Sequence, residues 1–279
     1  MNPVRKLIQR DREIPCRIMV VGDGMTDVYV QGRMEGCQER CTKFVQQLIT
    51  TVPGGADNAK RSLNSWFAGT RCMSDIAGGR RKTRFMVDSK CIFRYDQDES
   101  DFDLNLLRRE VMIKLDTFQP EGVLLSDYDK GLLTPDFIRQ VVNYCVNRYI
   151  PCVADVKREP ALYKGAIIKA NKVWGDKYRN QVTSDTTYIE THGELYPIVC
   201  EAKEEPTTDK SNLPNVKCVN HVGAGDCFAA HLILSLANKL SLKEAVAVAH
   251  SAGRVYVQCY FNEPPQVDRI ESDYLSGTQ

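Results

Sequence analysis

The stretch Gly223-Ala224-Gly225-Asp226-Cys227-Phe228-Ala229-Ala230-His231-Leu232 is the most informative part of the chain. The apolar side chains that follow its glycines recur at helical spacing: Phe228, Leu232, Ile233 and Leu236. The sequence therefore predicts a glycine-rich turn that opens a helix, with a short strand before it at Asn215 to Val219. Such a turn leaves backbone N–H groups unpaired at the positive end of the helix dipole, and glycine lets an anion approach them closely. We expect an anion site at Gly223, Ala224 and Gly225.

Asp226 falls in the first turn of this predicted helix, beside the anion site. A carboxylate there can orient and deprotonate an acceptor hydroxyl while the N–H groups stabilise charge on a phosphoryl group in transfer. The same four residues also have a simpler interpretation, in which Asp226 complements the helix dipole and the glycines only shape a turn. Short glycine motifs occur in many proteins, so other parts of the sequence are needed to choose between these two interpretations.

Short apolar runs alternate with helix-like segments, which is the pattern of a parallel sheet covered by helices. Three of these runs lead to an acidic residue: 17–21 to Asp23, 122–126 to Asp127 and 150–154 to Asp155. Open α/β sheets bind ligands at the carboxyl ends of their strands, although one acid there can equally cap the next helix. Three acids at equivalent places favour a ligand site.

Two helix starts are marked by capping residues: Thr134-Pro135, and Ser241 with Glu244. Residues 28–52 and 82–96 differ, because they carry β-branched and charged side chains without helical periodicity. We expect them to contain the strands of a small lid beside the main sheet. The exposed edge of such a lid can pair with a second copy, so a homodimer through the lid is plausible.

The composition excludes several classes of function. The 279 residues are 43% hydrophobic, enough for a substantial core, and the net charge of +1 provides no general attraction to nucleic acid or an anionic membrane. No apolar stretch is long enough to span a bilayer, and the N-terminal residues lack the apolar segment of a signal peptide. Eleven cysteines, an odd number at irregular spacing, predict reduced thiols in a cytoplasmic protein.

Four motifs, in this order, resemble those of the ribokinase-like (PfkB) carbohydrate kinases: Gly22-Asp23, Pro53-Gly54-Gly55-Ala56-Asp57-Asn58, Ser126-Asp127-Tyr128-Asp129-Lys130-Gly131 and Gly223-Ala224-Gly225-Asp226. Residues 20–27, 94–96 and 155–157 resemble, within that family, the D-glycero-β-D-manno-heptose-7-phosphate kinase domain. The likeness runs from about Arg17 to Val257. It implies a three-layer α/β/α core with a mostly parallel sheet and a small β-strand lid, as one kinase domain over residues 1–279. It also implies ATP-dependent phosphoryl transfer to a sugar or sugar phosphate.

The resemblance implies roles for single residues. Asp226 would be the catalytic base, with Gly223, Ala224 and Gly225 as the anion hole. The acceptor sugar would lie along these residues: Asp27, Gly54, Gly55 and Asn58, with Asp127 and Lys130 near the acceptor and the phosphates. The residues expected to lie near the nucleotide are Lys157, Asn171, Thr191, Gly193 and His250. Mg²⁺ would accompany ATP, held mainly by phosphates and water.

The basic run at residues 78–84 could bind the phosphate group of a sugar phosphate where the lid meets the core. We favour Arg84 and Arg94 as the residues that bind this phosphate. A solvated turn is the alternative for this run. Nucleic acid is not expected as a partner, because aromatic residues for base stacking are sparse around it.

The chain departs from the family pattern in several places. The segments 58–84 and 171–223 are short, Trp174 stands where the family often has the Glu of Asn-x-x-Glu, and His250 stands where Asn is common. Two other functions therefore stay open. One is a nucleoside kinase of the same fold, with Tyr128 or Trp174 as a wall for the base. The other is a non-catalytic sensor of sugar phosphate or nucleotide, which loss of the Glu favours and retention of Asp226 opposes.

Overall fold

The computed structural model describes residues 2–36, 41–66, 71–88, 90–99, 102–193, 195–201, 207–208, 215–260 and 262–277. Its elements, in chain order, are α1 (Pro3–Glu13), β1 (Arg17–Gly36), β2 (Thr42–Gly55), α2 (Ala56–Asn64), β3 (Arg71–Val87), β4 (Lys90–Gln97), α3 (Leu104–Phe118), β5 (Gly122–Ser126), α4 (Pro135–Asn147), β6 (Cys152–Asp155), the 3₁₀ turn η1 (Pro160–Tyr163), β7 (Ile167–Asn171), α5 (Lys172–Tyr178), the 3₁₀ turn η2 (Arg179–Gln181), β8 (Tyr188–His192), β9 (Leu195–Cys200), β10 (Thr207–Thr208), α6 (Ala224–Ala237), α7 (Leu242–Tyr256) and α8 (Val267–Ser276).

Within the described residues the strands form one mixed sheet in the order β10-β9-β8-β7-β6-β5-β1-β3-β4, with β2 paired to β1 outside this path. The central pairs, from β3 through β1 and β5 to β8, are parallel. Antiparallel pairs lie at the two ends, where β8, β9 and β10 follow one another and where β1 meets β2 and β3 meets β4. The predicted ribokinase-like α/β fold, with its mostly parallel sheet, is confirmed.

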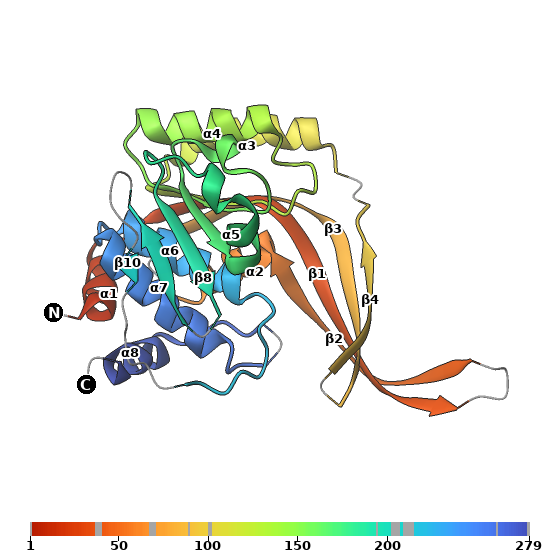
Figure 1. Cartoon of the computed structure of the whole chain (residues 1–279). Helices are drawn as coiled ribbons and strands as arrows, with labels where there is room; N and C mark the ends of the chain where they lie inside the picture. The colour runs from red at the N-terminus through yellow and green to blue at the C-terminus, as the bar shows by residue number, and fades with distance from the viewer. Residues whose placement is uncertain are drawn as a thin grey trace.

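The lid is made by the core strands themselves. β1 pairs with β5 only over Ile18–Gly22 and then with β2 over Gly24–Gly36, because β5 ends at Ser126 and leaves the edge of β1 open. β3 accompanies β1 on the other side from Arg17 to Gln31. Figure 1 shows the four strands curving away from the helices, with the β1–β2 hairpin projecting furthest. β1 and β2 cross residues 28–52 and β3 and β4 cross residues 82–96, and the sequence did not predict that these strands continue from the core.

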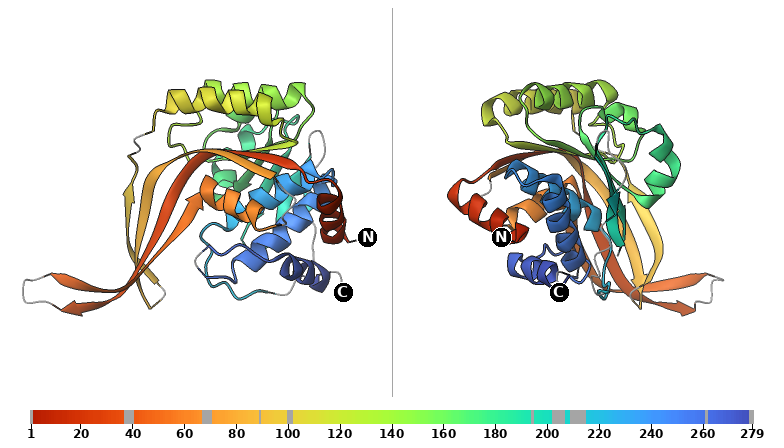
Figure 2. Two further views of the ribbon diagram at one scale, coloured as in Figure 1. Left: turned by 180° about the vertical axis from the view of Figure 1, so that it is seen from behind. Right: turned by 60° about the vertical axis from the view of Figure 1, so that its left-hand side comes forward.

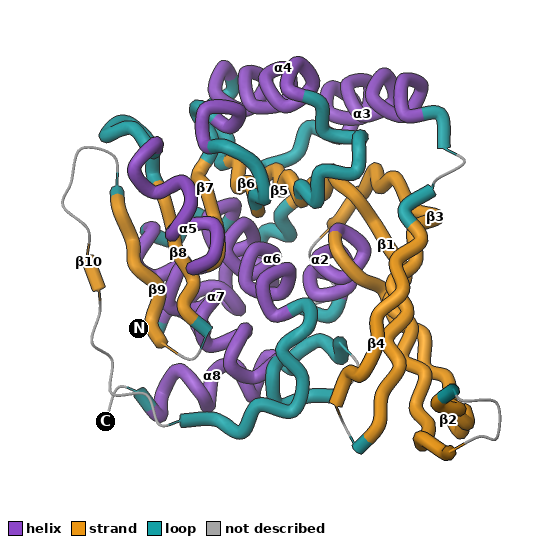
Figure 3. Tube along the Cα trace, turned by 45° about the vertical axis from the view of Figure 1, so that its right-hand side comes forward, coloured by secondary structure: helices purple, strands orange, loops and turns teal. Residues whose placement is uncertain are grey.

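Helices cover both faces of the core sheet (Figures 2 and 3). Alternation along β1 divides its side chains between the two layers. Ile18 and Val20 lie in the hydrophobic cluster with α1, α2, α6, α7 and α8, whereas Met19 and Val21 lie in the cluster with α3, α4 and α5. All four side chains are fully buried.

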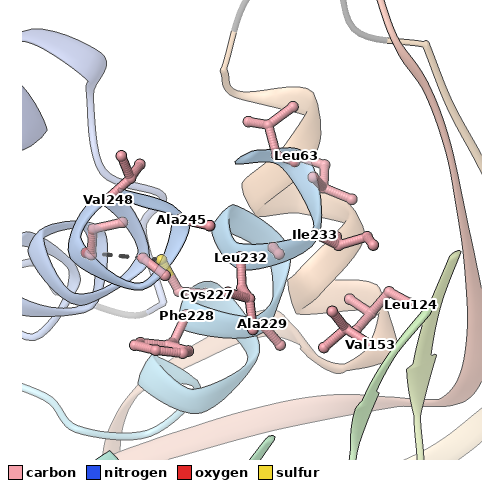
Figure 4. Close-up of a cluster of buried hydrophobic side chains, with 14 of the residues drawn as sticks. Leu63, Leu124, Val153, Cys227, Phe228, Ala229, Leu232, Ile233, Ala245 and Val248 are labelled. Carbon is pink, nitrogen blue, oxygen red and sulfur yellow. Dashed lines mark hydrogen bonds between the residues drawn. The ribbon is translucent and has the colours of Figure 1, made fainter. Parts of the chain in front are cut away.

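Helix α6 is buried on nearly all sides, because its apolar residues occupy the whole circumference rather than one stripe. It packs between α2, α7 and the strands β5 and β6. Figure 4 shows this contact, with Leu232 and Ile233 of α6 near Leu63 of α2 and with Leu124 and Val153 of the sheet nearby. This packing fixes the N-terminus of α6, where the glycine-rich turn lies.

Both predicted helix caps are confirmed. The Thr134 hydroxyl accepts a hydrogen bond from the Phe137 N–H at 3.4 Å, and Ser241 and Glu244 form a reciprocal capping box. The predicted strand at 215–219 is wrong. That segment is irregular, because its last N–H groups turn to α7 instead of pairing with a strand: those of Val219 and Asn220 both donate to the Val257 carbonyl.

Nine cysteines of the described residues are thiols, as expected for reduced cysteines. Cys41, beside the Gly36–Thr42 pair that closes the β1–β2 hairpin, is instead disulfide-bonded. Among the helices described, none has both the length and the apolar character needed to cross a membrane.

Candidate active site

A cavity of about 490 Å³, here called the core cavity, opens between the carboxyl ends of β6, β7 and β8 and the N-terminus of α6. It brings together residues that lie far apart in the sequence. The predicted catalytic residues line it: Gly223, Ala224, Gly225 and Asp226. So do the predicted nucleotide-binding residues: Lys157, Asn171, Thr191, Gly193 and His250.

Gly223 is the cap residue before α6 and has a φ of 86°, in the left-handed region that favours glycine. A Cβ at this position would lie 2.4 Å from both Asn58 Nδ2 and the Tyr256 hydroxyl, so no other residue fits without rearrangement. The turn brings Gly223, Ala224 and Gly225 to the wall of the core cavity, where an anion site is expected, and the Ala224 N–H donates to the His221 carbonyl at 3.3 Å.

The Asp226 carboxylate is 3% exposed and is held by two donors. The Tyr128 hydroxyl donates to Oδ1 at 2.6 Å, and Asn58 Nδ2 donates to Oδ2 at 3.2 Å. Asn58 is itself oriented, because its Oδ1 accepts from the Tyr256 hydroxyl at 3.2 Å and its Nδ2 also donates to the Gly223 carbonyl at 3.1 Å. The orientation of the carboxylate is therefore fixed from three separate segments.

The pKa of Asp226 is raised from its ordinary value to about 6, mainly by burial and next by the nearby Asp155 carboxylate. Tyr128, Lys169 and Asn58 act in the opposite direction, because each stabilises the charged form. A carboxylate with a pKa near 6 is ionised at neutral pH and is still basic enough to accept a proton.

Lys169 is a residue that the sequence analysis missed. It lies on β7, is 3% exposed, lines the core cavity and pairs through Nζ with Asp155 Oδ2 at 3.1 Å. A Cβ at Gly225 would lie 2.7 Å from this ammonium group, so the positive charge lies directly beside the glycine-rich turn. The alternation of side chains along β7 could have revealed Lys169 from the sequence. Ile168 and Ala170 pack into the layer of α3 and α4, so Lys169 between them must face α6.

The acceptor-side residues form a second group under the lid. Asp27 is 3% exposed, forms an ion pair with Arg84 and accepts a hydrogen bond from Asn262 Nδ2 at 3.4 Å. Gly54 and Gly55 end β2 and lead into α2, which carries Asn58 toward Asp226. Arg84 and Arg94 line a further cavity of about 900 Å³, here called the lid cavity, together with Lys217 and His221.

The two cavities adjoin, because Cys218 and His221 line both of them. A ligand in the lid cavity and a ligand in the core cavity would therefore share a wall. Asp226 lines only the core cavity, and its carboxylate is hydrogen-bonded to Asn58, one of the predicted acceptor-binding residues.

Asp27, Gly54, Gly55 and Asn58 line neither cavity, and Asp127 and Lys130 lie elsewhere. Asp127 is fully buried and its carboxylate is occupied by the Arg158 guanidinium and the Tyr163 hydroxyl, so it faces away from both cavities. Its role near the acceptor was inferred from its motif, but its side chain points into the layer of α4 and η1. Lys130 forms an ion pair with Asp98 at 2.6 Å and lines neither cavity.

The three acids at strand ends have different tasks. Asp23 is fully buried and accepts hydrogen bonds through Oδ2 from the N–H groups of Tyr128 at 3.1 Å and Lys130 at 3.0 Å. It therefore shapes the loop after β5. Asp127 organises Arg158, and only Asp155 of the three lines the core cavity. Equivalent positions in the sheet did predict proximity, but not which carboxylate faces the ligand.

The departures from the family pattern also have structural explanations. Trp174 packs against Tyr178 and Tyr188, donates from Nε1 to the Arg158 carbonyl at 2.7 Å, and lines neither cavity. It cannot serve as a wall for a nucleobase in this arrangement. His250 is 5% exposed in the wall of the core cavity, and burial lowers its pKa to about 4, so its ring is neutral. Its Nε2 has no hydrogen-bond partner among the described residues.

Comparison with known proteins agrees with this geometry. Residues 187–264, which include the glycine-rich turn, match the model of the pfkB family carbohydrate kinases. The bifunctional protein HldE of Campylobacter concisus is 30% identical over 286 residues, and that of Campylobacter curvus is 29% identical over 288 residues. Each alignment covers 86% of this chain and 61% of the relative, so the chain spans only part of the length of these proteins.

Two solved structures show the same fold. A putative ribokinase from Agrobacterium tumefaciens has a TM-score of 0.69 at 14% identity, covering 94% of this chain and 98% of its own. Phosphofructokinase-2 from Escherichia coli, in complex with fructose-6-phosphate, has a TM-score of 0.70 at 15% identity, covering 95% and 100%. The chain is therefore similar to the PfkB carbohydrate kinases in its glycine-rich segment and has the ribokinase-like fold.

Proposed function

We propose that the chain transfers the γ-phosphoryl group of ATP to a hydroxyl group of a sugar phosphate, with Asp226 as the general base. The observation that carries this proposal is the position of Asp226. Its carboxylate is buried beside the Gly223–Gly225 turn, has a pKa of about 6 and lines the core cavity, which adjoins the lid cavity. A base is needed where the acceptor hydroxyl meets the phosphoryl group, and an anion site is needed beside it.

In the proposed reaction, Asp226 accepts the proton of the attacking hydroxyl while the N–H groups of the glycine-rich turn stabilise charge on the phosphoryl oxygens. Lys157 and Lys169 line the same cavity and supply positive charge to the phosphates. The neutral ring of His250 and the apolar residues Leu195, Pro197 and Val257 give the far part of the core cavity the character of an adenine site. ATP is therefore the proposed donor.

The residues of the core cavity fit a magnesium ion that is held mainly by nucleotide phosphates. Asp155 Oδ1 is buried and has no hydrogen-bond partner within the described part of the chain, with Lys157 Nζ at 3.9 Å. Mg²⁺ commonly takes one or two carboxylates in addition to phosphates and water. Asp155 is the residue we propose to hold it, and the ion would supply neutralisation of the phosphate charge.

The lid cavity favours a phosphorylated acceptor over a nucleoside. Arg84 and Arg94 come from opposed strands of the lid and Lys217 comes from the segment before α6, so cationic groups surround the cavity. A nucleoside carries no charge to use them, whereas a phosphate group binds well to such a cluster. A heptose 7-phosphate, which the sequence resemblance implies, is our preferred acceptor. Asp27 and Asn58 are proposed to bind its hydroxyl groups.

We also propose a homodimer through the lid. Five large apolar side chains of β2 and β4 are about half exposed: Leu48, Ile49, Ile92, Phe93 and Tyr95. Exposed apolar surface of this kind on edge strands suits pairing with a second copy. Light scattering should report a dimer for the wild type and a monomer for Phe93→Lys, and a monomeric wild type would contradict the proposal.

An ADP-release screen tests the activity. The purified chain is incubated with ATP and Mg²⁺ and with sugars, hexose and heptose phosphates, or nucleosides. We expect turnover with a sugar phosphate and none with nucleosides. If the protein binds ATP but none of the tested acceptors leads to release of ADP, the kinase proposal fails. A nucleotide-binding sensor then replaces it.

A further inference from the structure

Tyr128 lies in the loop after β5. Its backbone N–H is fixed by the buried Asp23 carboxylate at 3.1 Å, and the N–H of Lys130, two residues on, is fixed by the same oxygen at 3.0 Å. The loop backbone is therefore anchored, and the side chain reaches across the core cavity to α6. There its hydroxyl donates to Asp226 Oδ1 at 2.6 Å.

The ring of Tyr128 also contacts two cations from different parts of the fold. Lys82 Nζ, from the lid strand β3, lies 5.1 Å from the ring centroid, and Lys157 Nζ, from the segment after β6, lies 4.9 Å from it. Both distances are in the range of cation–π interactions. Tyr128 thus touches the lid, the phosphate-binding side of the core cavity and the proposed base at once.

From this geometry we infer that Tyr128 is a positioning residue for phosphoryl transfer: its hydroxyl holds the Asp226 carboxylate toward the acceptor and keeps it ionised. The inference rests on the proposed function, because it assigns Tyr128 a task only if Asp226 is the base. It adds a residue whose side chain need not touch either substrate to affect the reaction.

The charges around Asp226 explain why this hydrogen bond matters. Asp155 on β6 disfavours the charged carboxylate, whereas Lys169 on β7 and Asn58 on α2 favour it, and the Tyr256 hydroxyl on α7 acts through Asn58. Burial, followed by the charges of Asp226 and Asp155, holds the pKa of Tyr128 well above its usual value. The hydroxyl consequently stays protonated and remains a donor wherever Asp226 is ionised.

The experiment compares Tyr128→Phe with the wild type over a range of pH. Phenylalanine keeps the ring and its contacts with the lysines but removes one of the two donors to Asp226. We expect kcat to fall by roughly tenfold to a hundredfold, the loss expected for a hydrogen bond to a charged group. The acid limb of kcat should move to higher pH, because the charged carboxylate has lost a donor. The KM for ATP should change little. Tyr144→Phe is the matched control, because that hydroxyl donates to the Leu115 carbonyl, outside both cavities.

A double-mutant cycle separates positioning from a general structural effect. If Tyr128 acts through Asp226, Tyr128→Phe should have no further effect on kcat in the Asp226→Asn background. Should Tyr128→Phe not fold, replacement of Tyr128 by 3-fluorotyrosine keeps the hydroxyl and the packing while making the group a stronger donor. The acid limb should then move to lower pH.

The outcomes are distinguishable. An active wild type whose acid limb is unmoved by either change at position 128, or a Tyr128→Phe effect that persists undiminished in Asp226→Asn, would overturn the inference and leave the proposed function intact. A wild type that phosphorylates no acceptor would overturn both.

Discussion

Lys169 and Asp155 form a buried ion pair in the wall of the core cavity, with Nζ 3.1 Å from Oδ2 and each side chain 3% exposed. Neither charge is surrounded by protein alone, because both side chains also face the cavity where the phosphates are proposed to bind. The pair keeps the ammonium beside Gly225 when no nucleotide neutralises it. It also moderates the repulsion between Asp155 and Asp226.

Lys169→Met should weaken ATP binding by at least tenfold and leave Asp155 with only the more distant Lys157 ammonium, at 3.9 Å, as its ion-pair partner. Breaking one partner of a buried pair costs about 3 kcal/mol or more, although access to the cavity will reduce this loss here. Calorimetric titration with ATP and urea unfolding measure the two effects. The double variant Lys169→Met with Asp155→Leu should recover stability but not ATP affinity. Unchanged ATP affinity in Lys169→Met would remove this lysine from the phosphate site.

Asp226→Asn should lower kcat by about 10²–10⁴-fold, with ATP affinity retained, because a positioned general base contributes that much. In the wild type, kcat should rise with pH through about 6 as the carboxylate ionises. That limb should be absent from the residual rate of the variant. A pH–rate profile of both proteins checks this, and an identical acid limb in the variant would assign the base to another residue.

The same substitution has a predicted effect on stability. The pKa of Asp226 is raised in the folded protein, so this group favours folding when protonated, and that contribution is lost as pH rises through about 6. Asparagine stays neutral. The melting temperature of Asp226→Asn relative to wild type should therefore be higher at about pH 7 than at about pH 4. Thermal unfolding at the two pH values measures it, and a difference of the opposite sign would show that the charged form is stabilised.

Gly223→Ala should abolish turnover and destabilise the fold. A Cβ would lie 2.4 Å from Asn58 Nδ2, and the left-handed backbone alone costs about 1–2 kcal/mol for a residue other than glycine. Gly36→Ala is the matched control, because a Cβ there has no neighbour within 4 Å among the described residues. ADP release and thermal unfolding are measured on both variants. A Gly223→Ala enzyme with normal kinetics would mean that the turn is not the anion site.

Lys217→Ala should raise the KM of a phosphorylated acceptor by about tenfold or more, as expected for loss of a charge-assisted contact. It should not affect the KM of the corresponding unphosphorylated sugar, nor that of ATP. Lys164→Ala, whose side chain is 79% exposed and far from both cavities, is the control. An equal change with both acceptors would show that Lys217 does not bind phosphate.

The fold could be predicted from local patterns because its signals are local. Short continuous apolar runs mark β1, β5 and β6, and capping residues mark α4 and α7. The glycine-rich turn before α6 could be located for the same reason. The failed strand at 215–219 depends on a distant partner, the Val257 carbonyl, which no local pattern reveals.

The site was predictable only in part, because the direction of a side chain depends on tertiary contacts. Asp127 and Tyr128 are neighbours in one motif, yet Asp127 turns toward Arg158 while Tyr128 reaches Asp226. Lys169 lies in a strand that contributes mostly apolar residues, and its burial required the partner Asp155 from the adjacent strand. These assignments needed the positions of several strands together.

The shared strands of core and lid limit how the lid can close over an acceptor. There is no linker in β1 or β3 on which the lid could swing as a rigid body, since both strands run through without interruption. Closure must instead bend the sheet elastically. The most compliant point is Asp23–Met25, where the pairing of β1 with β3 slips by one residue opposite Gly78 and Gly79 and where β1 exchanges β5 for β2. Asp23 also anchors the Tyr128 loop at this point, so bending the lid would pull on the support of the proposed base.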